Sequence, residues 1–205
     1  MKHLFKRELD KIKKNKKLKD KSIWLYLLFF NRLIYLVFNV IITKIYLLRC
    51  NHVGKMVFCK GKPDISNNGK IYIGNFNSIW SNISKTRLSV HSGGEIIIGN
   101  NNFLNGVFIS ASSKVILGNN IKIGPQTMIM DSDFHDVNDH NNEGLTSKII
   151  IEDDVWLGAR CTILKGVHIG TNSVVGVGAI VTKDVPKNAI VAGVPPKIIK
   201  MKDTQ

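Results

Sequence analysis

The chain has 205 residues and a formal net charge of +14, with 44% hydrophobic and 21% charged residues. This composition is typical of a globular protein and excludes a wholly disordered or collagen-like chain. The positive charge is concentrated at the amino terminus, where residues 1–22 hold ten basic and three acidic residues. Because the excess is not spread along the chain, a uniformly basic nucleic-acid-binding fold is not expected.

The first 50 residues consist of a basic arm, residues 1–22, and an apolar segment, residues 23–50. Basic residues interrupt the apolar segment, so no uncharged run reaches the ~18 residues that a membrane-spanning helix needs. Arg32, Asn39 and Thr43 share one narrow face of a helical wheel, which predicts an amphipathic helix with a wide apolar face. A basic arm and such a helix suit the surface of an anionic membrane, so we expect peripheral membrane contact. A helix packed on the main domain or on a sister subunit is the alternative, and a transmembrane span is a further one.

The three cysteines, Cys50, Cys59 and Cys161, are widely spaced and form no CxxC pair. Such a pattern predicts reduced thiols in a cytoplasmic protein. A secretory signal is not expected, because the charged stretch is long and no small-residue cleavage site follows the apolar segment.

Residues 51–205 are dominated by a period of six. Each hexad begins with a branched aliphatic residue and has a small residue or valine at its fifth place. The unbroken series starts at Ile151, Leu157, Ile163, Ile169, Val175 and Val181, and the same frame includes Leu117, Ile123, Ile129, Ile73 and Ile79. This period predicts an all-β fold, a left-handed parallel β-helix with three hexads per turn and the aliphatic residues inside. The pairs Gly74-Asn75, Gly99-Asn100 and Gly118-Asn119 are expected to supply the left-handed backbone of its corners.

The repeat is interrupted at residues 131–148, which contain no aliphatic hexad and are polar and acidic. We expect a loop extruded from the β-helix, a place where functional residues often lie. After the last hexad, residues 191–197 are expected to form a short cap.

Three segments of the repeat region, residues 154–159, 176–186 and 191–197, resemble the hexapeptide-repeat acyltransferases. The resemblance is greatest to the maltose and galactoside acetyltransferases and to the O-acetyltransferases of capsule and lipopolysaccharide gene clusters. It implies a homotrimer with active sites at the subunit clefts, acetyl-CoA as cosubstrate, and no metal. The implied acceptor is a sugar hydroxyl of a bacterial surface polysaccharide or its precursor, modified in the cytoplasm at the inner face of the membrane.

A sugar hydroxyl is a weak nucleophile, so acetyl transfer to it needs a base, and imidazole titrates near neutrality. His135 lies in the extruded loop and falls at the place of the family's essential histidine. Asp133 or Asp131 is expected to orient its ring, as a carboxylate does in a serine-protease triad.

The resemblance also implies binding residues. Asn105 and Trp156 are expected to contact the acceptor, although an asparagine at a corner and a tryptophan covering the coils would explain them as well. The pantetheine arm would lie along the backbone of Gly158, Ala159, Gly176, Val177 and Ala179, and the nucleotide end near Thr182, Lys183, Lys197 and Lys200. Lysines suit that end because coenzyme A carries phosphates.

Other functions remain open from the sequence. Within the acyltransferases, the acceptor could be the amine of an amino sugar or a small molecule. His135 and His140 have the H-x4-H spacing of the γ-class carbonic anhydrases, but the third zinc ligand expected ~35 residues upstream is missing. A membrane-tethered, non-catalytic scaffold is the third alternative.

Overall fold

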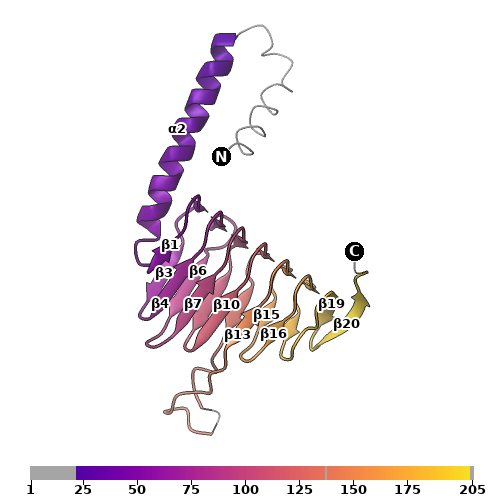
Figure 1. Ribbon diagram of the computed structural model, residues 1–205. Coiled ribbons are helices and arrows are strands. Elements are labelled where there is room, and N and C mark those ends of the chain that lie inside the picture. Colours follow the sequence, from indigo (N-terminus) through magenta and orange to yellow (C-terminus); the bar gives the residue numbers. More distant parts are fainter. Residues whose placement is uncertain (1–21, 137, 204–205) are drawn as a thin grey trace. The chain divides into compact units, whose positions relative to one another are not determined.

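The computed structural model describes residues 22–136 and 138–203. The chain divides into two units, Met1–Ile41 and Ile42–Gln205. Helix α2 (Ser22–Tyr46) makes up the described part of the first unit and ends in the second, which holds all the strands (Figure 1). The basic arm expected at residues 1–22 lies outside the described residues, apart from Ser22.

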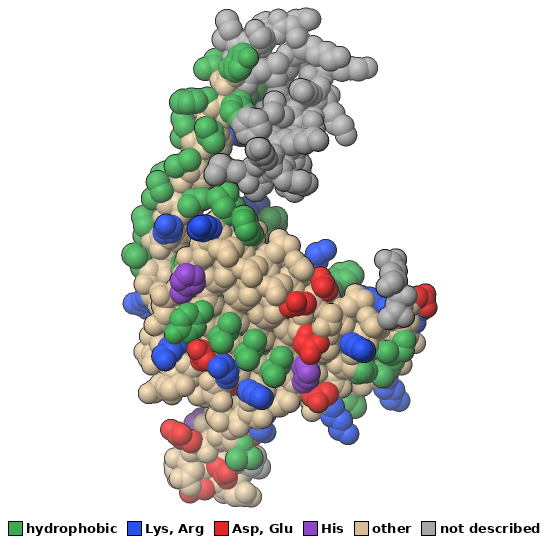
Figure 2. All heavy atoms as spheres, in the orientation of Figure 1, with side chains coloured by type: hydrophobic (Ala, Val, Ile, Leu, Met, Phe, Trp, Pro, Cys, Tyr) green, Lys and Arg blue, Asp and Glu red, His purple; other side chains and the backbone are tan. Residues whose placement is uncertain are grey.

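Exposed apolar side chains line the described part of α2, and Figure 2 shows them in green on the face in view. Tyr26, Phe30, Ile34, Phe38 and Ile41 are each more than half exposed. At 100° per residue these side chains and their apolar neighbours leave free a narrow face, where Arg32, Asn39 and Thr43 lie. The wide apolar face predicted from the sequence is therefore present.

The last turn of α2 belongs to the second unit and is packed into it. Thr43 and Leu47 are buried, and Thr43 Oγ1 accepts a hydrogen bond of 2.8 Å from the backbone N–H of Cys59. This contact covers the amino-terminal end of the β-helix core.

Three sheets form the sides of the second unit, and we name them A, B and C. Sheet A contains β1 (His52–Val53), β4 (Lys70–Ile73), β7 (Glu95–Ile98), β10 (Lys114–Leu117), β13 (Ile149–Ile151) and β16 (His168–Ile169). Sheet B contains β2 (Phe58–Lys60), β5 (Ser78–Trp80), β8 (Phe103–Asn105), β11 (Lys122–Ile123), β14 (Trp156–Leu157), β17 (Val174–Val175), β19 (Ala189–Gly193) and β20 (Pro196–Met201). Sheet C contains β3 (Asp64–Asn67), β6 (Arg87–Val90), β9 (Phe108–Ala111), β12 (Met128–Met130), β15 (Thr162–Ile163) and β18 (Ile180–Val181).

The chain visits sheets A, B and C in turn, and from β1 to β15 each strand pairs in parallel with the strand three places later, whereas β17 pairs with β19. One circuit of the three sheets is one coil of a parallel β-helix (Figure 1). The aliphatic residues that open the hexads from Leu117 to Val181 are 0–1% exposed, as the period of six predicted. Burying such a side chain contributes about 1.5–3 kcal/mol, so the interior column stabilises the whole stack.

The corner between sheets A and B is held by a ladder of side chains. Asn75, Asn100 and Asn119 donate their backbone N–H groups to the side-chain oxygens of Asn100, Asn119 and Asp153, at 2.7–2.8 Å. Each coil is thereby tied to the next one. The buried carboxamides of Asn77 and Asn102 form a second, inner ladder beside it.

The expectation that the Gly-Asn pairs supply the left-handed backbone of these corners is corrected. The residues with a left-handed backbone follow the Gly-Asn pairs: Phe76, Asn101 and Asn120 have φ of 58–59°. The glycines are required for close approach, because a Cβ on Gly99 would lie 2.3 Å from the carbonyl oxygen of Gly118 in the next coil.

Two segments depart from the coil. Residues 131–148 leave the β-helix between β12 and β13, at the corner of sheets C and A (Figure 1). At the carboxyl end, β20 turns back and pairs antiparallel with β19. The extruded loop and the short cap predicted from the sequence are both present.

Candidate active site

The extruded loop begins at a buried carboxylate. Asp131 is 1% exposed, and its two oxygens accept hydrogen bonds from the backbone N–H groups of Ser112 and Ser113, at 2.7 and 2.8 Å. The N–H of Ser147 donates to the Asp131 carbonyl oxygen at 2.9 Å, so the two ends of the loop meet here. Asp131 therefore anchors the loop to the preceding coil.

His135 lies on the loop, where it is exposed to solvent and pairs with Glu143 across a short antiparallel bridge. Its Nδ1 is 3.0 Å from the carbonyl oxygen of His140. A carbonyl oxygen only accepts hydrogen bonds, so this contact requires the proton on Nδ1. Nε2 then keeps its lone pair, and the ring can act as a base at that atom.

The structure gives the ring a carbonyl partner in place of the expected carboxylate. Asp131 faces the two serine amides, and Asp133 Oδ2 is 2.6 Å from Lys165 Nζ. In the described chain the Nδ1 side of His135 is occupied by His140, which leaves that position closed to either aspartate. Asp133 instead ties the loop to the corner of the following coil.

Two further contacts fix the loop. The ring of Phe134 meets that of His91, two coils earlier, edge to face with centroids 6.0 Å apart. Gly144 packs on the backbone of His135, where a Cβ would lie 2.6 Å from the His135 carbonyl oxygen. The sequence analysis did not single out His91, Gly144 or Lys165. His91 and Lys165 occupy the same corner as the loop in neighbouring coils, so the repeat register could have indicated them.

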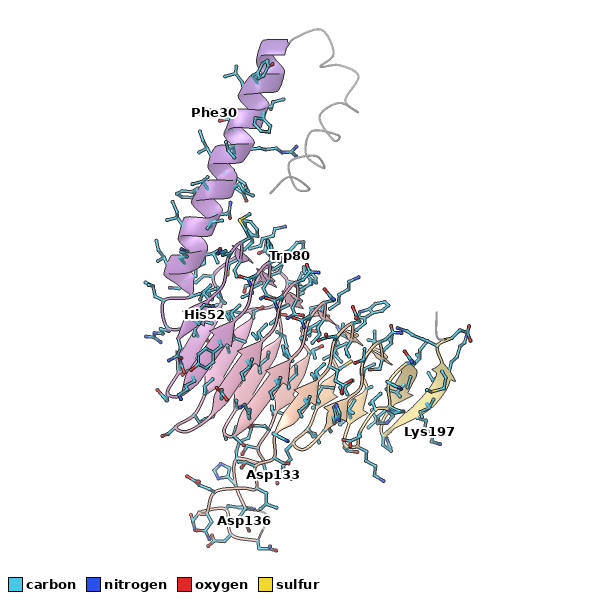
Figure 3. The ribbon with its side chains drawn as sticks, viewed as in Figure 1. Phe30, His52, Trp80, Asp133, Asp136 and Lys197 are labelled. Atoms are coloured by element: carbon cyan, nitrogen blue, oxygen red, sulfur yellow. The ribbon has the colours of Figure 1, made fainter. Side chains whose placement is uncertain are left out.

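The predicted acceptor residues lie on sheet B, away from the loop. Trp156 is 56% exposed on β14. Asn105 ends β8 opposite Trp80, and its buried Oδ1 has no hydrogen-bond partner within the described part of the chain. Figure 3 shows Trp80 and the loop residue Asp133 at opposite edges of the coils. One chain therefore does not bring His135 together with Asn105.

The predicted coenzyme A residues fall at three places. Gly158, Ala159, Gly176 and Val177 lie at the corner of sheets B and C, Thr182 and Lys183 follow β18 at the corner of the loop, and Lys197 and Lys200 are exposed on β20. Lys183 lies one coil after Lys165, because Ile163 pairs with Val181.

Some of the residues predicted to bind coenzyme A form hydrogen bonds within the β-helix. The N–H groups of Gly158 and Gly176 donate to carbonyl oxygens of the next coil, Val175 and Val191, at 2.8 and 2.7 Å. Ala179 is fully buried. The N–H groups of Gly158 and Gly176 are therefore used within the coils, whereas Val177 is 71% exposed, and contact of this set with pantetheine stays a prediction.

Cys161 is fully buried, and burial raises the pKa of its thiol. Burial also raises the pKa values of the Cys50 and Cys59 thiols to about 12. None of the three offers an accessible thiolate near neutral pH. Across residues 22–136 and 138–203, no three His, Cys, Asp or Glu side chains form a group that could hold a metal ion.

Comparison with known proteins agrees with this architecture. Residues 148–183 match the family model described as the hexapeptide repeat of succinyl-transferase. The solved structure of a galactoside acetyltransferase in complex with coenzyme A has a TM-score of 0.56 and 26% identity, over 78% of this chain and 70% of that one. The left-handed β-helix of hexapeptide repeats, and the resemblance to hexapeptide-repeat acyltransferases, are thus confirmed.

Two curated acetyltransferases are similar to parts of this chain in sequence. The galactoside O-acetyltransferase of Escherichia coli strain K12 is 38% identical over 111 residues, covering 53% of this chain and 55% of that protein. The 2,3,4,5-tetrahydropyridine-2,6-dicarboxylate N-acetyltransferase of Staphylococcus aureus strain JH9 is 57% identical over 54 residues, covering 26% and 23%. The chain spans about half or less of the length of the curated galactoside acetyltransferases that it matches.

Proposed function

We propose that this chain is an acetyl-CoA-dependent O-acetyltransferase whose acceptor is a sugar hydroxyl of a bacterial surface polysaccharide or its precursor. The similarity to galactoside acetyltransferases, one of them solved with coenzyme A, supports the reaction class. The observation that carries the proposal is the 3.0 Å contact between His135 Nδ1 and the His140 carbonyl oxygen. It leaves Nε2 as an exposed base on an anchored loop.

In the proposed reaction, His135 Nε2 takes the proton of the acceptor hydroxyl as that oxygen attacks the thioester carbonyl carbon. The carbon–sulfur bond then breaks, and the imidazolium returns the proton to the coenzyme A thiolate. The imidazolium keeps its hydrogen bond to the carbonyl oxygen throughout, because Nδ1 carries its proton in both states. Transfer is direct, which accords with the burial of Cys161.

The proposed active site lies between two chains of a homotrimer. The placement of Asp133 and Trp80 at opposite edges of the coils supports this arrangement, because Trp80 pairs with Asn105 (Figure 3). In a heterologous ring, the loop of one subunit can face sheet B of the next. The side of sheet B that carries Asn105 and Trp156 would then face the acceptor. The exposed Lys183, Lys197 and Lys200 suit the phosphates of coenzyme A.

We also propose that α2 holds the enzyme at the inner face of the cytoplasmic membrane. By length and composition, Tyr26–Tyr46 could cross a bilayer. However, both flanks of the helix are basic: residues 1–22 hold ten basic residues, and residues 47–62 hold four with no acidic residue. A spanning helix would leave one basic flank on the outer side, against the usual distribution of charge. A helix lying in the interface keeps both flanks on the anionic leaflet.

The loop supplies a matched pair of variants for the catalytic proposal. We expect His135→Ala to lower thiol release from acetyl-CoA with a glycan acceptor by about 10²–10⁴-fold, because the base is lost. His140→Ala keeps the backbone carbonyl that orients His135, and should retain activity within a few-fold. Near-normal turnover of His135→Ala would contradict the base assignment, and equal loss in both variants would point to a shared ligand role of the two imidazoles.

Transfer to an amine is the second candidate, favoured by the 57% identity to an N-acetyltransferase. The bond formed distinguishes the two, since hydroxylamine cleaves an acetyl ester and leaves an acetyl amide intact. Mass spectrometry of the product before and after hydroxylamine should show loss of the acetyl mass if the acceptor is a hydroxyl.

A further inference from the structure

A groove runs along the outer face of sheet B beside its corner with sheet A. Its volume is 670 Å³, and eight of its thirteen lining residues are polar. The register places Ser78, Phe103, Lys122, Trp156 and Val174 side by side on five successive coils. At about 4.8 Å per coil, the groove is roughly 19 Å long.

Aromatic rings stand along this groove. Phe76 and Trp156 are 53% and 56% exposed, near its two ends. Phe103 lies between them and is held edge to face against Trp80, with centroids 4.9 Å apart. Large rings exposed in a polar groove gain little from the fold itself, so they point to a bound molecule that has apolar faces.

Phe76 has a second unusual property. Its φ is 59°, in the left-handed region, and the equivalent places in the following four coils hold Asn101, Asn120, Asp154 and Asn172 at 58–60°. Asparagine and aspartate adopt this backbone readily, whereas a bulky aromatic residue does so at a cost. Here the costly residue also exposes its ring, which indicates that the ring serves a contact outside the chain.

Most of the other side chains that line the groove are polar and can form hydrogen bonds. Carboxamides of Asn101 and Asn120, the carboxylate of Asp154 and the ammonium groups of Lys122 and Lys202 surround the rings. Sugars present apolar ring faces for stacking and hydroxyls that both donate and accept hydrogen bonds. A lipid would not use so polar a lining.

We propose that this groove binds a segment of several sugar units of the acceptor glycan, as an extended acceptor subsite on sheet B. The identification of the ligand rests on the proposed function. The reacting unit would lie towards Trp156, and the chain would extend over Phe103 to Phe76. The enzyme would then prefer an oligomeric or polymeric acceptor to a free sugar.

Phe76→Asn tests the far end of the groove with little risk to folding. The substitution installs the residue that Asn101 and Asn120 place at the same φ in neighbouring coils, so the variant should unfold at an equal or higher temperature. Met56→Asn is the matched control, because Met56 has φ of 54° one coil earlier and does not line the groove.

Binding of the full-length wild type and variants is measured on an array of bacterial surface polysaccharides and their di- to octasaccharide fragments, without acetyl-CoA. We expect the wild type to bind at least one glycan and to prefer its tetrasaccharide or longer fragments to its disaccharide. Phe76→Asn should weaken that binding by about 3- to 10-fold, the effect of one stacking contact, and Met56→Asn should not.

Absence of binding to any glycan, or equal binding by wild type and Phe76→Asn, overturns the proposal. A change of oligomer mass in Phe76→Asn, seen by light scattering, would overturn it as well, because the occupant would then be a second copy of the chain. Glycan binding without acetyl transfer would refute the proposed reaction and keep the groove, whereas transfer that is insensitive to Phe76→Asn would refute the groove alone.

Discussion

The carboxylate of Asp131 determines where the extruded loop leaves the β-helix. It is buried and satisfies two backbone N–H groups, those of Ser112 and Ser113, which belong to the preceding coil. The position of His135 follows from this anchor and from the contact of Asp133 with Lys165. The placement of His135 and the stability of the coils are therefore linked through one side chain.

We expect Asp131→Ala to destabilise the fold by about 1–3 kcal/mol, because two partly buried N–H groups lose their charged acceptor. Activity should fall as well, since the start of the loop is released. Thermal unfolding and thiol release measure the two effects. Asp139→Ala, at an exposed place in the same loop, is the control and should change neither by much. A fully stable Asp131→Ala variant would show that the anchor is dispensable.

A second residue-scale network surrounds Glu152. Its Oε2 accepts hydrogen bonds from Thr171 Oγ1 and from the Thr171 N–H, at 2.6 and 2.7 Å, and its Oε1 is 2.8 Å from His168 Nε2. These contacts, chiefly those of Thr171, hold the pKa of Glu152 below its ordinary value.

The lowered pKa of Glu152 predicts a pH-dependent contribution to stability. The stabilisation is present above the ordinary glutamate pKa of ~4.3 and is lost as the pH falls through the lowered value. Glu152→Gln should cost less than about 1 kcal/mol at pH 7, because the carboxylate is largely solvated. Urea unfolding at pH 7 and near pH 3 should show the difference from wild type shrinking with acid. A difference that grows at low pH would contradict the assignment.

At the scale of the elements, the period of six was sufficient to predict the strands. Whether Ile151 or Val181 points inward depends only on its place in its own hexad, so local pattern predicts it. The need for Gly99 arises from Gly118 in the next coil, and the partner of His135 depends on the path of the loop backbone. Such contacts between segments have no signature in a local pattern, and for that reason the left-handed corner residue and the ring partner were predicted wrongly.

Helix α2 gives the element-scale prediction. The double variant Phe30→Asp/Phe38→Asp places two charges on the wide apolar face and should lower co-sedimentation of the full-length protein with phosphatidylglycerol vesicles by roughly tenfold or more. Asn39→Asp adds a charge on the narrow polar face and should have a smaller effect. Binding should also weaken in high salt and with phosphatidylcholine vesicles. Equal sedimentation of all three proteins would contradict membrane contact through α2.

At the scale of the whole molecule, the proposed site requires more than one chain. His135 and Asn105 lie on different sides of a single β-helix, so neither the loop nor sheet B can complete the site alone. The sequence predicted both residues, through the family resemblance, but their separation became evident only from the coil register.

Mixed assemblies test this division of the site. We expect His135→Ala and Asn105→Ala each to be poorly active alone. If each site takes His135 from one subunit and Asn105 from the next, refolding the two variants together should restore activity to roughly a quarter of the wild-type value in a random trimer. Thiol release after co-refolding measures it. No recovery, in mixtures that sediment as trimers, would place both residues of a site in one chain.

The reversed direction of β20 has a consequence for growth of the stack. A solenoid of identical rungs offers, at its last rung, a template on which another molecule could continue the same parallel pairing. Here the last strand of sheet B is already paired with the antiparallel strand β20, which begins at Pro196 and contains Lys197 and Lys200. At this end of sheet B the antiparallel strand occupies the edge that a further parallel rung would need, which disfavours end-to-end polymerisation through sheet B.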